Sequence, residues 1–368
     1  MILGVLKDDD NRVALTPDVV QKLAEYHEIW IESEAGASAF YSDSLYTNAG
    51  ATIAPAAEVI AKANILVRIK PPSPEVLQQL AANSVVISSF QPFNNPAVIE
   101  QLSQYPLTVF SMDMLPRTTL AQDKDVLSSM ASMAGYRAVL EAATHLPRYF
   151  PMLTTAAGSI PPAKVLILGA GVAGLQAIAT AKRLGSVVEA FDTRSAVKEE
   201  VQSLGAKFVE VEGARDDQAA GGYAVEQTEE YKQRQQALIA DKSAKADVII
   251  TTALLRGKRS PILITTETVE NMKPGSVIVD LAASGGGNCE LTKDNQTIQH
   301  QGVTIIGDSA LEAKMPMHAS QLYAKNIFNF LKILTNEGKL TLDFENPLID
   351  GACLIHEGQP HNQVPQQA

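Results

Sequence analysis

Short apolar runs alternate with helix-like segments along residues 1–115. Five runs have the composition of buried strands: ILGVL, IWIES, ILVRIK, SVVISSF and LTVFSM. Between them lie PDVVQKLAEY, PAAEVIAKA, PEVLQQLAA and PAVIEQLSQ, and each begins with proline, a residue favoured at the first position of a helix. Apolar strands separated by helices of this length predict βαβ units and a parallel sheet.

A second alternating region begins near residue 164. Its strand-like runs are KVLILGAG, VVEAFD, KFVEV, DVIITTA, SVIVDLA and VTIIGD. Between the two regions we predict a long helix from about Lys124 to about His145, followed by a linker over residues 154–164. The same alternation predicts a second parallel sheet.

Three segments fall outside this alternation. Residues 212–230 are rich in charge and glycine, so we expect a mobile excursion there. Residues 318–334 have an apolar face at helical spacing, which predicts a helix that packs back on the first domain. We expect the chain from about Gly358 onward to be disordered.

These elements predict an α/β protein with two doubly wound parallel-sheet domains. We expect a flavodoxin-like N-terminal domain from residues 1–126 and 314–368, and a Rossmann domain from residues 127–313. Long helices would join the two domains, with a cleft between them. The length of 368 residues agrees with two domains, because single cores stop growing at about 250–300 residues.

Composition and charge narrow the class of protein. Hydrophobic residues make up 46% of the chain and charged residues 19%, as in an ordinary folded protein. The formal net charge of -11 disfavours nucleic acid or anionic lipid as a direct partner. Two cysteines, Cys289 and Cys353, are too few for a disulfide framework and have no metal-type spacing, so we expect a reducing cytoplasm and no metal.

Neither a secretory signal nor a membrane span is predicted. The N-terminus MILGVLKDDD lacks a cationic start followed by an apolar core. The longest apolar stretch, residues 165–181, contains glycines and Gln176, and it ends at Lys182 and Arg183. That composition indicates a strand, a turn and a helix.

The turn in this stretch has the pattern of a dinucleotide-binding site. GAGVAG follows the strand KVLIL and precedes a helix, as the fingerprint requires. The positive end of the helix would face the pyrophosphate. The predicted residues are Gly169, Ala170, Gly171, Val172, Ala173 and Gly174. The alternative is a glycine turn in a domain that binds no nucleotide.

Asp192 closes the next strand, VVEAFD. A carboxylate at this position accepts hydrogen bonds from ribose hydroxyls and repels a 2′-phosphate, which favours NAD over NADP. Thr193 and Arg194 follow, and the cation of Arg194 leaves some room for NADP.

Later strand ends should reach the same pocket, because ligands of open parallel sheets bind beyond the carboxyl ends of the strands. This places Thr252, Ala253, Leu254 and Leu281 near the cofactor. The alternative for each of them is a core or turn position.

Four polar side chains precede the long helix: Arg117, Gln122, Asp125 and Ser128. We call them the polar quartet. One interpretation is helix capping, with Asp125 or Asp123 as the cap and the others solvated.

The chain resembles the alanine dehydrogenase/transhydrogenase family, and within it the NAD-binding alpha subunits of proton-translocating NAD(P) transhydrogenases. The likeness covers nearly the whole chain. It is carried by NRVALTPDVV, VRIKPP, SSMASMAGYRAV, AGVAGLQAIATAKRLG, AGGYAVE, ITTALLRGKRSPILIT, MKPGSVIVDLA and SQLYAKN. Long matches of this kind are far more specific than a bare glycine pattern.

The resemblance implies roles for further residues. The family's Arg, Gln, Asp and Ser fall on the polar quartet, which would orient the dihydronicotinamide and its ribose for hydride transfer. Hydride transfer between two nicotinamides needs positioning but no acid or base. Gly222 and Tyr223 fall on the family's mobile loop, which closes over NAD(H). For Tyr223 the alternative is an exposed aromatic residue on a flexible loop.

The chain departs from the usual family pattern at four places. Met130 and Ser132 stand where Gln and Asn are usual, Ser284 replaces a common acidic residue, and residues 308–314 read DSALEAK. These departures concern supporting and partner-facing contacts.

Two rival functions remain. An alanine dehydrogenase would use residues that match Arg12 and Lys70, but its acid/base histidine is missing from SSFQPFNNP and its catalytic aspartate falls on Ser284. A non-catalytic NAD-sensing module would not need the polar quartet.

The resemblance also implies partners. One dinucleotide fingerprint means that NADP(H) must be bound by a partner subunit, and a separate membrane-spanning subunit would carry the proton. We expect a peripheral homodimer on the cytoplasmic face of the inner (plasma) membrane.

Overall fold

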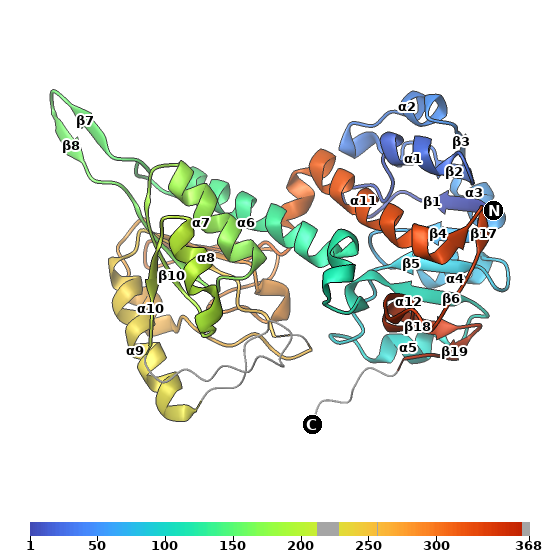
Figure 1. The fold of residues 1–368 in the computed structure, drawn as a ribbon. Helices are drawn as coiled ribbons and strands as arrows, with labels where there is room; N and C mark the ends of the chain where they lie inside the picture. Colours follow the sequence, from blue (N-terminus) through green and yellow to red (C-terminus); the bar gives the residue numbers. More distant parts are fainter. Residues whose placement is uncertain (212–227, 256, 363–368) are drawn as a thin grey trace. The chain divides into compact units, whose positions relative to one another are not determined.

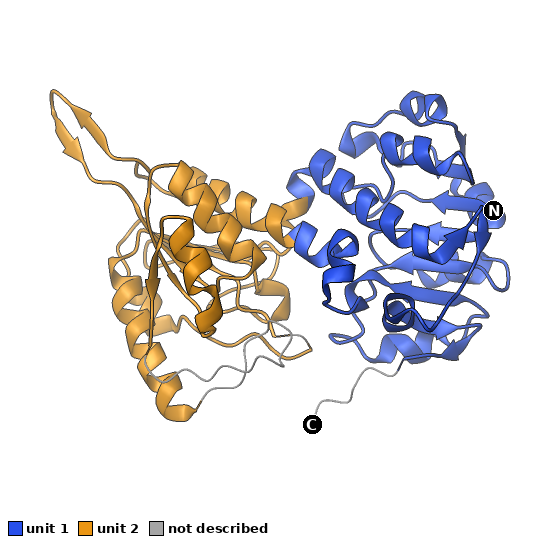
Figure 2. Ribbon diagram, in the orientation of Figure 1, with its two compact units in different colours: residues 1–130, 313–368 blue, residues 131–312 orange. Residues whose placement is uncertain are grey.

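The computed structural model describes residues 1–211, 228–255 and 257–362. The chain divides into two compact units, shown in different colours in Figure 2. Unit 1 contains Met1–Met130 and Ala313–Ala368, and unit 2 contains Ala131–Glu312. Each unit is built around one large sheet, which confirms the predicted α/β class.

The sheet of unit 1 has eight strands in the order β19-β18-β6-β5-β4-β1-β2-β3. Strands β1 to β6 are parallel, whereas β18 pairs antiparallel with β6 and with β19. The sheet is therefore mixed and only mostly parallel. The strands are β1 Ile2–Val5, β2 Glu28–Glu32, β3 Ala51–Ala54, β4 Ile65–Val67, β5 Val85–Ser88, β6 Thr108–Ser111, β18 Cys353–His356 and β19 Gln359–Pro360.

The expectation of disorder from Gly358 is wrong for the residues that the structure describes. The N–H of Gly358 donates to the carbonyl of Leu107 at 2.9 Å, and β19 adds a strand to the edge of the sheet. Backbone pairing with the sheet orders this short polar segment although it buries little apolar surface.

Helices cover the sheet of unit 1 as predicted from the proline-initiated segments. Pro17 and Pro74 occupy the first turn of their helices, whereas Pro55 and Pro96 lie one residue before theirs. The helices are α1 Pro17–Leu23, α2 Asp43–Asn48, α3 Ala56–Lys62, α4 Pro74–Gln79, α5 Ala97–Leu102, α11 Pro316–Leu334 and α12 Pro347–Ala352.

The late helix α11 returns to the first unit and completes its core, as its apolar face predicts (Figure 1). Tyr323, Ile327 and Phe330 are buried among strand residues such as Leu3. The rings of Phe330 and Phe110 meet edge to face, with centroids 5.6 Å apart. Aromatic contacts of this kind add to the stabilisation from area burial.

The sheet of unit 2 has seven strands in the order β11-β10-β9-β12-β13-β15-β14, of which β14 is antiparallel. The strands are β9 Lys164–Leu168, β10 Val187–Phe191, β11 Lys207–Val209, β12 Val248–Thr251, β13 Val277–Asp280, β14 Thr297–His300 and β15 Val303–Ile306. The associated helices are α6 Val126–His145, which continues from unit 1, α7 Val172–Arg183, α8 Lys198–Ser203, α9 Glu229–Lys245 and α10 Thr266–Glu270.

Alternate residues of β9 enter two different cores. Val165 and Ile167 pack with α6 and α7, whereas Leu166 and Leu168 pack with α9. A strand that is apolar on both faces is typical of a parallel sheet covered by helices on both sides.

The predicted linker over residues 154–164 is wrong in part. Strands β7 Leu153–Thr155 and β8 Gly158–Ile160 form an antiparallel hairpin that projects from unit 2 (Figure 1). The prolines that suggested a linker, Pro161 and Pro162, lie just after β8, where no ladder hydrogen bond is lost.

Within the described residues, no helix is both long enough and apolar enough to cross a membrane.

Candidate functional site

The glycine turn lies where the strand order of unit 2 reverses. Strand β9 is flanked by β10 on one side and by β12 on the other, so the crevice beyond its carboxyl end is the expected ligand site of a doubly wound sheet. The turn after β9 leads directly into α7, whose N-terminal residue is Val172.

Two of the glycines are required by the geometry of the turn. Gly169 has a φ of +102°, and a β-carbon there would clash with Oγ1 of Thr252. A β-carbon on Gly174 would clash with the carbonyl oxygen of Gly169. The turn and the helix therefore pack too closely for any side chain at either position.

The space at Gly171 suits a phosphate. A β-carbon on Gly171 would meet only Nη2 of Arg194, at 3.9 Å, and Gly171 caps α7 without a side chain. The first N–H groups of α7 thus point toward open space at the positive end of a twelve-residue helix. The residues present fit a dinucleotide pyrophosphate.

The carboxylate of Asp192 is already engaged by the chain itself. One oxygen accepts from the N–H of Ala170 at 2.7 Å, and the other accepts from the N–H of Arg194 at 2.9 Å. The guanidinium of Arg194 binds both oxygens, at 2.9 and 2.7 Å. A ribose hydroxyl would therefore bond to Asp192 only if Arg194 withdraws, because a carboxylate offers about four acceptor positions. Thr193, between the two, is partly buried.

The end of β12 contacts the glycine turn. Oγ1 of Thr252 donates to the carbonyl of Gly169 at 3.0 Å. Ala253 and Leu281 are partly buried, and Leu254 is an exposed apolar side chain. The structure thus groups the predicted strand-end residues around the turn, while their contact with a cofactor stays a prediction.

The polar quartet lines one cavity of about 290 Å³ in unit 1, together with Leu115, Pro116, Thr118, Thr119 and Ala121. Asp125 accepts from the N–H of Ser128 at 2.9 Å and from its hydroxyl at 2.6 Å. Nη2 of Arg117 lies 3.4 Å from Oγ of Ser128 and 3.9 Å from Oδ2 of Asp125. Gln122 is exposed and makes no side-chain hydrogen bond within the described residues. Ligand pockets begin at about 300 Å³, so the cavity suits one ring of a ligand.

Sequence reasoning missed the residues that hold the quartet in place. The carbonyl of Asp123, inside the loop, accepts from Nδ2 of Asn326 at 2.9 Å and of Asn329 at 3.1 Å. Oδ1 of Asn326 accepts from the hydroxyl of Ser129 at 2.8 Å. Both asparagines belong to α11, and an amide on the otherwise apolar face of that helix was the available signal.

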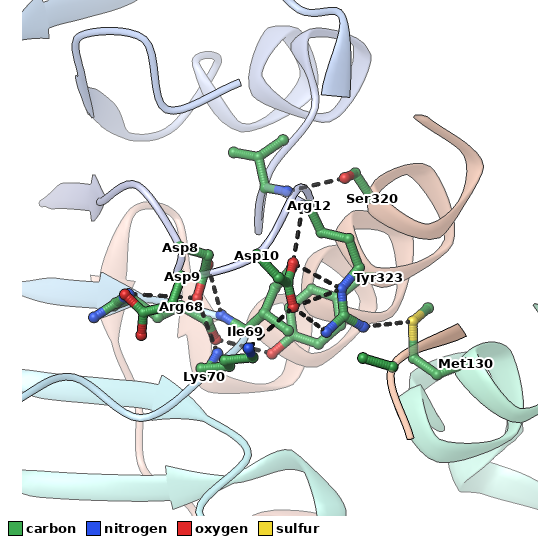
Figure 3. Close-up of polar contacts among 12 residues, drawn as sticks. Asp8, Asp9, Asp10, Arg12, Arg68, Ile69, Lys70, Met130, Ser320 and Tyr323 are labelled. Atoms are coloured by element: carbon green, nitrogen blue, oxygen red, sulfur yellow. Dashed lines mark hydrogen bonds and ion pairs between the residues drawn. The ribbon is translucent and has the colours of Figure 1, made fainter. Parts of the chain in front are cut away.

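Arg12 and Lys70 meet at the carboxyl ends of β1 and β4, the reversal point of the sheet in unit 1 (Figure 3). Nε and Nη2 of Arg12 donate to the carboxylate of Asp10 at 3.1 and 2.5 Å. Nζ of Lys70 lies 3.6 Å from the same carboxylate. Both cations therefore share an internal carboxylate, which a cap or simple surface charge would not require.

Burial and charge act in opposite directions on two of the neighbouring acids. Burial raises the pKa of Asp8 above its ordinary value, although the N–H of Lys70 and the charge of Arg68 oppose the shift. Burial also acts to raise the pKa of Asp10, but the hydrogen bond and charge of Arg12 outweigh it, so this pKa is lowered. The Asp10–Arg12 pair is thus ionised and fixed.

Other predicted features have plain placements. Gly222 and Tyr223 lie outside the described residues. Met130 accepts a contact from Nη1 of Arg12 at 3.3 Å, and Ser284 is exposed. Among the described residues, no group of three or more His, Cys, Asp or Glu side chains could hold a metal ion.

Comparisons with known proteins agree with the fold and the motifs. The model of the alanine dehydrogenase/PNT N-terminal domain matches residues 6–134, and that of the C-terminal domain matches residues 138–363. The first of the separately encoded portions of NAD(P) transhydrogenase subunit alpha in Rhodospirillum rubrum is 42% identical over 360 residues, 95% of this chain and 94% of that protein.

Two solved structures share the fold of the whole chain. The crystal structure of transhydrogenase from Sinorhizobium meliloti matches with a TM-score of 0.90 and 40% identity, over 98% of this chain and all of that one (100%). An L-alanine dehydrogenase structure matches with a TM-score of 0.82 and 26% identity, over 98% and 96%. The resemblance predicted from the sequence motifs is confirmed.

Proposed function

Since the chain belongs to the alanine dehydrogenase/PNT family and is homologous to the alpha subunit of NAD(P) transhydrogenase, we propose that it is the NAD(H)-binding subunit of a proton-translocating transhydrogenase. In this role it passes hydride between NAD(H) on this chain and NADP(H) on a partner subunit. The observation that carries the proposal is the polar quartet gathered around one cavity.

Each segment of the site would perform one task. The N–H groups of the first turn of α7 would bind the pyrophosphate, and Asp192 would bind the adenosine ribose. Gln122, which is exposed to the cavity, would bond to the nicotinamide end of the nucleotide. Bound NAD(H) would supply the hydride. The quartet belongs to unit 1 and the glycine turn to unit 2, so their joint action rests on the family resemblance.

The quartet suits positioning rather than proton transfer. Asp125 is held by Ser128 and lies beside Arg117, an arrangement that favours an ionised carboxylate and a fixed cation. Transfer of hydride between two nicotinamides needs the reacting carbons at contact distance and aligned, and misplacement by about 1 Å costs about a hundredfold.

The proposal includes further subunits. This chain has one dinucleotide fingerprint, so NADP(H) would be bound by a partner subunit. The name of the Rhodospirillum rubrum relative marks it as one portion of a divided alpha subunit, which supports an assembly of several chains. We place the proton path in a separate membrane-spanning subunit, and this chain on the cytoplasmic face of the inner (plasma) membrane.

A homodimer is included in the same proposal. The β7–β8 hairpin and its base expose Tyr149, Met152 and Ile160, to 55, 66 and 43%. Apolar side chains on a projecting hairpin support contact with a second copy of this chain. Sedimentation of a variant with polar residues at Met152 and Ile160 tests this, because a dimer held elsewhere would not dissociate.

The rival functions are less well supported. In alanine oxidation Arg12 and Lys70 would bind a substrate carboxylate, but both face Asp10 (Figure 3). Ser284 cannot act as a carboxylate base, and no histidine occurs in residues 88–96. A sensing module would have no use for an exposed glutamine beside an ion pair.

The test combines the chain with its NADP-binding partner subunit. We expect NADH to bind the isolated chain, hydride transfer to NADP only with the partner present, and no oxidation of alanine. Transfer by the isolated chain would contradict the division of labour, and alanine-dependent formation of NADH would favour the dehydrogenase.

A further inference from the structure

A buried carboxylate organises the turn after β13. Asp280 is fully buried and makes five hydrogen bonds as acceptor. The donors are the hydroxyls of Thr251 (2.8 Å) and Thr292 (2.7 Å) and the N–H groups of Ala282 (3.0 Å), Asn288 (2.8 Å) and Cys289 (3.0 Å). A carboxylate with this many short donors is well compensated for burial. It joins the end of β12 to the glycine-rich segment that contains Asn288.

Asn288 in turn holds the loop that follows β12. Its Oδ1 accepts from the N–H of Ala253 at 2.9 Å, and its Nδ2 donates to the carbonyls of Ala253 and Pro261, both at 2.8 Å. Its own carbonyl accepts from the N–H groups of Leu263 and Ile264 at 2.8 and 3.0 Å. One fully buried side chain therefore satisfies both backbone polar groups of Ala253. Residues 252–255 have neither helix nor strand to do so.

The residue held in this way is next to the glycine turn. Thr252 precedes Ala253, and its Oγ1 donates to the carbonyl of Gly169 at 3.0 Å. A β-carbon on Gly169 would lie 3.4 Å from the N–H nitrogen of Ala253. A shift of Ala253 would therefore move atoms that contact the turn itself.

We propose that Asn288 is a positioning residue for the nucleotide site and that Asp280 anchors it. By fixing Ala253, Asn288 fixes the wall against which the glycine turn packs. This inference rests on the proposed binding of NAD(H) at that turn, but it concerns a side chain that would not touch the nucleotide.

The experiment measures NADH affinity of the full chain by fluorescence titration, together with thermal unfolding. Asn288→Ala removes three hydrogen bonds to the loop, and we expect it to weaken NADH binding by about tenfold or more. Asn288→Asp keeps the shape and the acceptor for Ala253, but it turns a carboxylate oxygen toward two carbonyls. A carboxyl in that place should have a raised pKa and donate again when protonated. Its NADH affinity should therefore recover toward wild type between about pH 8 and about pH 5.5, whereas wild-type affinity changes little.

Asn346→Ala is the matched control. Asn346 caps α12 in unit 1 by accepting from Leu348 at 3.0 Å, so its loss should lower stability without changing NADH affinity. Wild-type affinity in Asn288→Ala, despite a lower unfolding temperature, would show a purely structural role. If Asn288→Ala does not fold, a pH profile of Asn288→Asp parallel to wild type overturns the inference. Failure of the wild-type chain to bind NADH would instead contradict the proposed function.

Discussion

Asp125 accepts two hydrogen bonds from Ser128, one from its N–H at 2.9 Å and one from its hydroxyl at 2.6 Å. The first bond is that of a helix cap, because Asp125 directly precedes α6 and Ser128 lies in its first turn. The second turns the hydroxyl oxygen toward Arg117, whose Nη2 is 3.4 Å away. The same carboxylate thus serves the start of the helix and the polar quartet, and the two roles can be separated by mutation.

Asp125→Asn should separate them. Asparagine caps helices about as well as aspartate, so the free energy of unfolding should change by less than about 1 kcal/mol. Loss of the charge beside Arg117 should slow hydride transfer about tenfold, since the cation loses a fixed partner. Single-turnover transfer and thermal unfolding measure the two effects. Thr265→Ala, which removes the cap of α10, should do the reverse: lower stability and normal transfer.

Nucleotide choice should depend on Asp192 and Arg194 together. Asp192→Ala should weaken NADH binding and narrow the preference over NADPH, because the repulsion of a 2′-phosphate is lost and Arg194 is released to bind it. Adding Arg194→Ala to that variant should weaken NADPH binding again. Calorimetry gives both affinities, and equal affinities of the wild-type chain for NADH and NADPH would remove the argument.

The Asp10–Arg12 pair should appear in the pH dependence of stability. The pKa of Asp10 is lower in the folded chain than its ordinary value, so the carboxylate stabilises the fold above the unfolded pKa of about 3.9. That contribution is lost as the pH falls through the folded pKa. Asp10→Asn should lower the free energy of unfolding at pH 7 by about 3 kcal/mol, because Arg12 stays buried, and it should flatten the acid limb.

Asp9→Asn is the control for this pair. The side chain of Asp9 is 75% exposed, and it lies 3.7 Å from Arg68, so its removal should change stability by less than about 1 kcal/mol. Denaturant unfolding at several pH values compares the three proteins. Equal acid limbs in wild type and Asp10→Asn would show that other carboxylates control acid unfolding.

Both thiols should be inert in the native chain. Burial raises the pKa of Cys289 to about 11 and that of Cys353 to about 12. A thiol reagent at neutral pH should modify neither residue until denaturant is added, and then both, because the thiolate is the reactive form. Rapid modification of the folded chain would show that one of the two segments opens.

Local patterns predicted much of the fold. The strands β1 and β9 were recognisable as apolar runs, since strands of a covered parallel sheet are buried on both faces. Strand β3 was missed because ATIA is short and rich in alanine, a weak strand former. The hairpin β7–β8 was missed because its two arms are short, mostly exposed and followed by prolines.

The same distinction holds for the site. The glycine turn is local: a strand, six residues and a helix carry the whole signal. Asn326 contacts Asp123 across a separation of 203 residues, and Asn288 contacts Ala253 across 35. An asparagine acquires such a role only through the fold, so no spacing in the sequence marks it.

The most direct test of the account is Gln122→Asn. Shortening the side chain by one methylene should reduce the single-turnover rate of hydride transfer to the NADP-binding partner by about ten- to a hundredfold, because it misplaces the bound ring by up to about 1 Å. NADH affinity should change far less, since the contacts at Gly171 and Asp192 remain. Gln101→Asn, at an exposed position of α5, should transfer at the wild-type rate. A wild-type transfer rate in Gln122→Asn would contradict the account and leave the polar quartet as a helix cap.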